Sequence, residues 1–245
     1  MPQTFYDTEL PDALFEAAAC SPDLRYDTIV VDEGQDFRQA WWEVVECLLA
    51  DAGRSEFYVF YDGNQRIYGR EAPLLRAMTP VPLTKNLRNT KPVFDLAKRF
   101  YDGQNYTSAG PDGVPVELVR ADTPGDVGRA VSKILHRVVH ELEHPTSDIC
   151  ILSSRSVNAC SLGGQKQLGA FRLTSDHNDP TDAVLLETIQ RFKGLERPVV
   201  VLIDMDKALQ DKELLYVGLS RARLVLFLVG SPTILEGLEQ VPEGA

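Results

Sequence analysis

Long apolar stretches are missing from this sequence. No apolar run approaches the roughly 20 residues that a helix needs to span a bilayer, so we expect no membrane partner. Residues 1–7 have neither a basic start nor an apolar core, and they do not resemble a signal peptide. With 44% apolar and 25% charged residues, the composition is typical of a globular protein, which we expect in the cytoplasm.

Cysteine is also scarce, and none of it occurs in a Cys-x-x-Cys pair. The four cysteines, Cys20, Cys47, Cys150 and Cys160, are scattered along the chain. This pattern argues against a disulfide framework and against a zinc site. We therefore predict reduced, mostly buried thiols, as in cytoplasmic proteins.

Basic charge is in the minority. The 25 Lys and Arg residues face 36 Asp and Glu residues, which gives a formal net charge of -11 and a pI near 4.9. Such a chain is not a protein whose whole surface binds phosphates, and strong autonomous binding of nucleic acid is not expected. A local basic groove stays possible because net charge says nothing about where charges lie.

What the sequence does contain is a repeated alternation of valine-rich runs and amphipathic segments. This alternation predicts an α/β fold with mainly parallel sheets and flanking helices. A less regular stretch, 156–187, is expected to hold a short helix and one or two strands. Strands are predicted at 28–31, 57–61, 116–119, 149–152, 199–203 and 224–229, and helices at 12–19, 38–49, 90–101, 124–141, 212–223 and 232–238.

Polar residues follow the first two predicted strands. Asp32 and Glu33 come directly after the run ending at Val31, and Asp62 follows the run 57–61. Both runs look like fully buried strands. The carboxyl ends of parallel strands share one edge of a sheet, where ligands bind. Paired acids there suit a magnesium-nucleotide site. The alternative, a solvated acidic turn, remains open on these residues alone.

Five segments, taken in order, resemble motifs of one family. They are 32–36, similar to a Walker B motif; 62–69, similar to Gly-Asp-x-x-Gln-x-Ile-Tyr-Gly with Tyr61 in place of the first glycine; 86–90, similar to Asn-Tyr-Arg-Ser-Thr; 188–196, similar to Thr-x-His-x-x-Lys-Gly-Leu-Glu; and 216–223, similar to Tyr-Val-Ala-x-Thr-Arg-Ala. The family is the UvrD/Rep-like superfamily 1 DNA helicases, and the resemblance covers about residues 26 to 230.

The resemblance implies roles in ATP hydrolysis. Asp32 would hold Mg and Glu33 would activate the attacking water. Gln65 would sense the γ-phosphate, and Arg88 and Arg221 would stabilise its charge. Without the resemblance, Arg221 and Arg223 look like a solvated pair of arginines at the end of a helix.

Further contacts are implied for the nucleotide and for DNA. Gly194, Glu196 and Gln190 belong to the segment that would approach the phosphates and ribose of ATP. Tyr68 could stack on a base of single-stranded or partly duplex DNA, with Arg70 beside it. For Tyr68, packing in a core is an equally good interpretation.

The phosphate-binding loop of such an ATPase, Gly-x-x-x-x-Gly-Lys-Ser/Thr, does not occur in this sequence. Only 31 residues precede Asp32, and the nearest cluster, Gly163-Gly164-Gln165-Lys166, lacks the spacing and the hydroxyl. The expected organisation is therefore the C-terminal part of a first RecA-like ATPase domain, 1–80, followed by a complete second RecA-like helicase domain, 81–245. An N-terminal ATPase segment would be a missing partner.

Three hypotheses follow for function. The first is a fragment of an ATP-dependent superfamily 1 DNA helicase or translocase that is inactive alone. The second is a non-catalytic, helicase-derived module that binds a partner protein or nucleic acid. The third, an unrelated α/β nucleotide-binding enzyme such as a kinase, would need its own phosphate loop, and the sequence has none.

Overall fold

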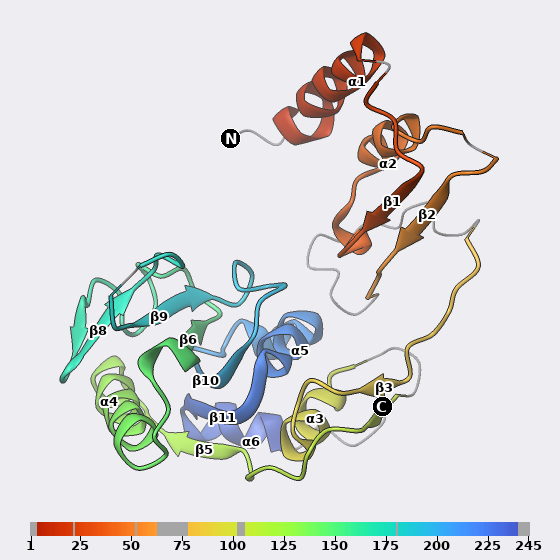
Figure 1. The fold of residues 1–245 in the computed structure, drawn as a ribbon. Coiled ribbons are helices and arrows are strands. Elements are labelled where there is room, and N and C mark those ends of the chain that lie inside the picture. The colour runs from red at the N-terminus through yellow and green to blue at the C-terminus, as the bar shows by residue number, and fades with distance from the viewer. Residues whose placement is uncertain are drawn as a thin grey trace. The chain divides into compact units, whose positions relative to one another are not determined.

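The computed structural model describes residues 4–21, 23–51, 53–62, 78–101, 106–179 and 181–239. The chain forms two compact units, residues 1–82 and 83–245, which are described separately (Figure 1). The first holds two strands and two longer helices, and the second holds a seven-stranded sheet.

The first unit is built on a pair of parallel strands. Its elements are α1 (Leu10–Cys20), β1 (Thr28–Val31), α2 (Gln39–Cys47) and β2 (Glu56–Val59). β1 pairs with β2 in parallel, with Val31 opposite Val59, so the two carboxyl ends share one edge as predicted. Trp42 of α2 packs against Val31 in a small core. This arrangement follows from the amphipathic pattern of α2.

The prediction that both strands are fully buried is wrong. Side chains alternate between the two faces of a strand, and only one face packs against α2. Three large side chains on the strands and just beyond β2 stay exposed: Val30 at 57%, Tyr58 at 51% and Phe60 at 54%. An apolar run is compatible with burial on both faces of the sheet, but it does not determine whether a second element packs there.

The second unit contains the predicted mainly parallel sheet. Its strands are β5 (Glu117–Arg120), β6 (Ile149–Ser153), β7 (Gln167–Leu168), β8 (Phe171–Thr174), β9 (Ala183–Thr188), β10 (Arg197–Ile203) and β11 (Ala222–Gly230). Their order in the sheet is β5-β11-β10-β6-β9-β8-β7, and every neighbouring pair is parallel except β7 with β8. The α/β fold class is confirmed.

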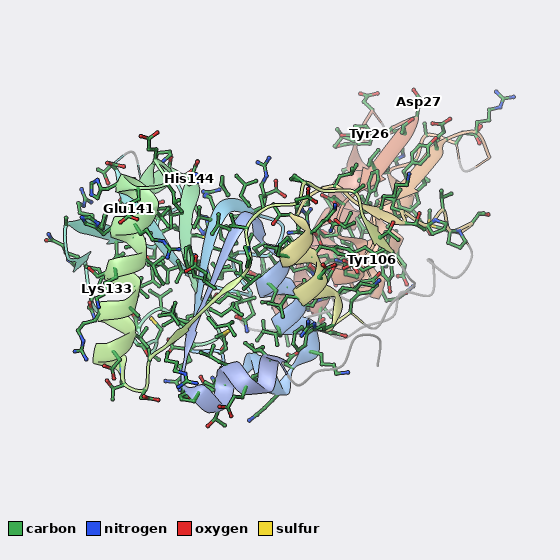
Figure 2. All side chains as sticks on the ribbon, turned by 90° about the horizontal axis from the view of Figure 1, so that it is seen from below. Tyr26, Asp27, Tyr106, Lys133, Glu141 and His144 are labelled. Atoms are coloured by element: carbon green, nitrogen blue, oxygen red, sulfur yellow. The ribbon has the colours of Figure 1, made fainter. Side chains whose placement is uncertain are left out.

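Helices cover both faces of this sheet (Figure 1). On one face lies α4 (Pro124–His140), whose predicted apolar residues are all buried; they are Val127, Val131, Ile134, Leu135 and Val138. Lys133 on α4 and Glu141, the residue that follows this helix, are both exposed (Figure 2). The other face packs against α5 (Lys212–Ser220), beside α3 (Lys91–Lys98) and α6 (Pro232–Glu239). The short pair β3 (Lys85–Asn86) and β4 (Thr107–Ser108) lies next to α3.

Three local predictions differ from the structure. The described part of 156–187 contains no helix, and it holds β7, β8 and most of β9, which is three strands rather than one or two. α3 ends at Lys98 rather than at residue 101, and α5 ends at Ser220 rather than at 223. The shorter α5 has a clear cause: Ala222 already pairs with Arg197 at the start of β10.

The cysteines are free throughout the chain. Burial raises the pKa of the Cys150 and Cys160 thiols, which keeps them protonated and unreactive. Cys20 and Cys47 are exposed, so the prediction of mostly buried thiols holds for only half of them. In the described part of the chain, no helix is long and apolar enough to cross a membrane.

Low pH is expected to reduce the stability of the second unit by protonating Asp126 in the first turn of α4. Thr123 and Asp126 form a capping box, and the hydrogen bond from the Thr123 hydroxyl holds the pKa of Asp126 below its ordinary 3.8. Because the unfolded carboxylate takes up a proton first, this contribution is present above about pH 4 and is lost as pH falls further. The pKa values of Asp112 and Asp179 are lowered in the same direction.

Thermal unfolding followed by circular dichroism from about pH 6 to about pH 3 measures this effect. We expect Asp126→Asn and Thr123→Ala each to reduce the fall in Tm over that range. An unchanged fall in both variants would contradict the assignment to the capping box.

Candidate functional site

The first group of site residues lies at the carboxyl end of β1. Asp32 is exposed, and its Oδ1 accepts a hydrogen bond of 2.9 Å from the backbone N–H of Glu33. Glu33 has φ 53° and ψ 41°, in the left-handed region that residues other than glycine seldom adopt. Such conformations persist only where the surrounding structure holds them, and they are common at functional sites.

Gln35 holds this turn in place. Its side chain is buried, its Nε2 donates to Glu33 Oε2 at 2.5 Å, and its Oε1 accepts from the Asp62 backbone N–H at 3.0 Å. One amide therefore fixes the Glu33 carboxylate and joins the ends of β1 and β2. We did not predict a role for Gln35; the sequence signal was its place within the segment 32–36, between Glu33 and Asp36.

Gly34 allows the two strand ends to approach each other. A Cβ at this position would lie 2.4 Å from Val59 Cγ1 and 3.2 Å from Trp42 Cη2. The Gly34 N–H donates to the Phe60 carbonyl at 2.9 Å. Any larger residue would push β2 or α2 away from the acidic turn.

Three predicted residues of this part of the chain, Gln65, Tyr68 and Arg70, lie outside the described residues. Their assigned roles in γ-phosphate sensing and nucleic-acid binding stay predictions.

The second group of site residues surrounds the junction of α5 and β11. Asn89 is buried, and its Nδ2 donates to the carbonyls of Ser220 at 3.0 Å and Ala222 at 2.6 Å. The Thr90 N–H donates to the Arg223 carbonyl at 3.0 Å. These bonds fasten the turn between β3 and α3 to the start of β11.

Arg88, next to this anchor, meets Glu196. Arg88 Nε lies 2.7 Å from Glu196 Oε2, and Arg223 Nε lies 3.4 Å from Glu196 Oε1. The structure thus brings together two predicted residues, Arg88 and Glu196, and adds Arg223. The sequence signal for Arg223 was the Arg-Ala-Arg spacing, to which we assigned no role beyond that of a pair with Arg221.

Arg221, by contrast, is only 1% exposed. Its Nε donates to the Val217 carbonyl at 2.9 Å, its Nη1 to the Leu195 carbonyl at 3.3 Å, and its Nη2 to the Ser220 hydroxyl at 3.0 Å. These bonds connect the end of α5 to the segment before β10. The predicted contact between Arg221 and a γ-phosphate stays a prediction.

The remaining predicted residues lie in the turns between β9 and β10. Gly194 has φ +80°, and no atom lies within 4 Å of a Cβ built on it. Gln190 is half-buried, and its carbonyl accepts from the Lys193 N–H at 3.3 Å. The segment begins at the buried carboxylate of Glu187, which lies 3.2 Å from Arg191 Nη1.

The donor set at Asp32 suits magnesium. Mg²⁺ binds through one or two carboxylates and completes its shell with water and phosphate oxygens. An exposed carboxylate at the open end of a strand meets that requirement. Among the described residues there is no cluster of three or more His, Cys, Asp and Glu side chains that could form an all-protein metal site.

The fold defines an α/β protein whose second unit is built on a mainly parallel seven-stranded sheet. Residues 183–229, from β9 to β11, match the family model of the UvrD-like helicase C-terminal domain. The resemblance predicted from the motifs is therefore confirmed, with direct support over that segment.

Known proteins resemble longer parts of the chain. It is 29% identical over 239 residues to a protein described as a probable DNA helicase from Mycoplasma pneumoniae (strain ATCC 29342 / M129 / Subtype 1), covering 82% of this chain. The chain spans 43% of the length of that relative.

Two solved structures are similar to this chain, and the first of them supports the fold. The structure of the PRRSV helicase has a TM-score of 0.50 at 13% identity, covering 87% of this chain and 37% of that one. The C-terminal domain of a possible DNA helicase from Lactobacillus plantarum WCFS1 has a TM-score of 0.48 at 22% identity, covering 64% of this chain and 94% of that one.

Proposed function

We propose that this chain is part of an ATP-dependent superfamily 1 DNA helicase or translocase. The observation that carries the proposal is the position of Asp32 and Glu33 at the carboxyl end of β1, held by Gln35. The helicase family match in the second unit supports it. Single-stranded or partly duplex DNA would be the substrate of the longer protein.

Asp32 would hold Mg²⁺ together with the phosphates of ATP. When bound, the ion supplies positive charge that stabilises the transferred phosphoryl group. Asp32 itself contributes a carboxylate oriented by the Glu33 N–H. Its exposure leaves it accessible to an entering ligand.

Glu33 would accept a proton from the attacking water. A general base must be held in reach of the proton it takes. The left-handed backbone of Glu33 and the amide of Gln35 both restrict where its carboxylate can lie. In this proposal Gln35 is a positioning residue that acts through its contacts with Glu33 and Asp62.

Arg88 would stabilise charge on the phosphates of ATP. A guanidinium group offers several donors in a planar fork that matches phosphate oxygens. Arg88 is half-exposed and its turn is fastened by Asn89, so the group is both accessible and anchored. Arg221, Gly194 and Gln190 keep the nucleotide roles that the helicase motifs imply.

The 245-residue chain alone is expected not to hydrolyse ATP above background, because its sequence contains no Gly-x-x-x-x-Gly-Lys-Ser/Thr loop. Phosphate release in the presence of Mg²⁺ and single-stranded DNA measures this. A version preceded by a phosphate-loop segment should hydrolyse ATP and lose that activity in Glu33→Gln. Magnesium-dependent hydrolysis by the 245 residues alone, removed by Glu33→Gln, would overturn the expectation.

A second candidate function is a non-catalytic binding module. The exposed apolar face formed by Val30, Tyr58 and Phe60 favours it, since parallel sheets are normally covered on both faces. In the leading proposal, further elements of a RecA-like domain, the N-terminal ATPase segment, cover this face. In the alternative, a partner protein does. Val30→Lys would weaken association with either occupant. The two cases differ in the unsubstituted chain: adding the N-terminal ATPase segment would restore ATP hydrolysis only in the leading proposal.

A further inference from the structure

We propose that Arg88 and Arg223 form a clamp for polyphosphate, and that Glu196 closes this clamp when no phosphate is bound. The inference rests on the proposed nucleotide function and deepens it. It assigns a phosphate contact to Arg223 and changes the role of Glu196 from a ribose contact to a competing anion. The observation behind it is one carboxylate that bridges two guanidinium groups, at 2.7 Å and 3.4 Å.

The backbone places the three side chains independently of their charges. The Arg88 N–H donates to Asn86 Oδ1 at 3.2 Å, and Asn89 is fastened to the junction of α5 and β11. The Arg197 N–H, next to Glu196, donates to the Arg221 carbonyl at 3.1 Å. Three chain segments therefore meet at the start of β11. The backbones of Arg88 and Arg223 would therefore stay close together if the carboxylate of Glu196 moved away.

The charges favour exchange of the carboxylate for a phosphate. One carboxylate between two guanidinium groups leaves one positive charge uncompensated. All three side chains are partly exposed, Arg88 at 43%, Arg223 at 52% and Glu196 at 39%. Exposed ion pairs of this kind contribute little to stability, so opening them costs little. A polyphosphate carries more charge and more acceptor oxygens than Glu196 and binds arginine forks in a bidentate manner.

Two other interpretations give different results. If the three residues form a solvated surface network without a ligand, polyphosphate binding does not depend on them. If Glu196 contacts the ribose, removing its charge leaves the affinity for a ligand without ribose unchanged. Inorganic tripolyphosphate, which has neither base nor sugar, therefore separates the three cases.

The test is a titration of the full chain with inorganic tripolyphosphate, followed by the NMR signals of the arginine Nε–H groups. We expect the signals of Arg88 and Arg223 to shift together. Glu196→Gln should tighten binding about fivefold to tenfold, and Arg223→Gln should weaken it by a similar factor, because each removes one charge at the clamp. Matched controls are Arg129→Gln on α4 and Glu141→Gln directly after it, both at exposed residues.

The results distinguish this inference from the proposed function. If Glu196→Gln does not tighten binding, or Arg223→Gln behaves like Arg129→Gln, the clamp is wrong. If Arg88→Gln alone weakens binding, the phosphate role of Arg88 stands without the clamp. If binding is indifferent to both arginines, the phosphate role proposed for the second unit fails as well.

Discussion

Asn89→Ala is expected to lower the free energy of unfolding of the second unit by about 3 kcal/mol. The buried amide of Asn89 donates to the carbonyls of Ser220 and Ala222, and its Oδ1 accepts from Asn86 Nδ2 at 3.0 Å. Alanine cannot replace these bonds. Each buried polar group left without a partner costs about 1 to 3 kcal/mol, and neighbouring costs are not fully additive.

Chemical denaturation followed by circular dichroism measures this loss. Both tryptophans, Trp41 and Trp42, lie in the first unit, so their fluorescence reports that unit separately. We expect the fluorescence transition to stay where it is in the wild type. Asn178→Ala, an exposed asparagine of the second unit, should change stability by no more than about 0.5 kcal/mol. An equally small change in Asn89→Ala would refute the role of Asn89 as an anchor.

Most of the long helices and buried strands could be predicted from the sequence because they depend on local patterns, whereas the short strands β3, β4, β7 and β8 could not. Apolar periodicity placed α4 within one residue, and the run ending at Val31 placed β1 correctly. The burial of that run could not be predicted. Val30 and Val31 are chemically alike, yet one is exposed and the other buried, because α2 covers only one face. Burial of a strand residue depends on which helices pack on each face of the sheet, and the strand's own residues do not specify this.

The site could be predicted only in part for a similar reason. Acids after a strand and arginines within motifs are visible in sequence, so Asp32, Glu33 and Arg88 were named. The positioning role of Gln35 depends on a hydrogen bond to the Asp62 backbone, 27 residues away. The meeting of Glu196 with Arg223 depends on the pairing of β10 with β11. Long-range pairing creates both contacts, and local patterns do not contain it.

Arg221→Ala is expected to destabilise the second unit by about 3 to 5 kcal/mol, the range for losing a large buried side chain together with its hydrogen bonds. The guanidinium of Arg221 is buried and donates to the carbonyls of Val217 and Leu195. Removing it leaves those acceptors without this donor and opens a void between α5 and the segment before β10. Arg88→Ala, which breaks only a partly exposed ion pair, should cost no more than about 1 kcal/mol.

The comparison of these two variants decides how an activity loss at Arg221 is interpreted. Denaturation curves for both, with Arg223→Ala as a second exposed control, give the stability cost of each arginine. If Arg221→Ala is destabilised as expected, loss of ATP hydrolysis when this substitution is made in the version with a phosphate-loop segment reflects a disrupted α5–β11 junction before it reflects a lost phosphate contact. If instead its stability matches that of Arg88→Ala, the burial of Arg221 contributes little. Its side chain could then leave the junction to reach a phosphate, as the helicase motif implies.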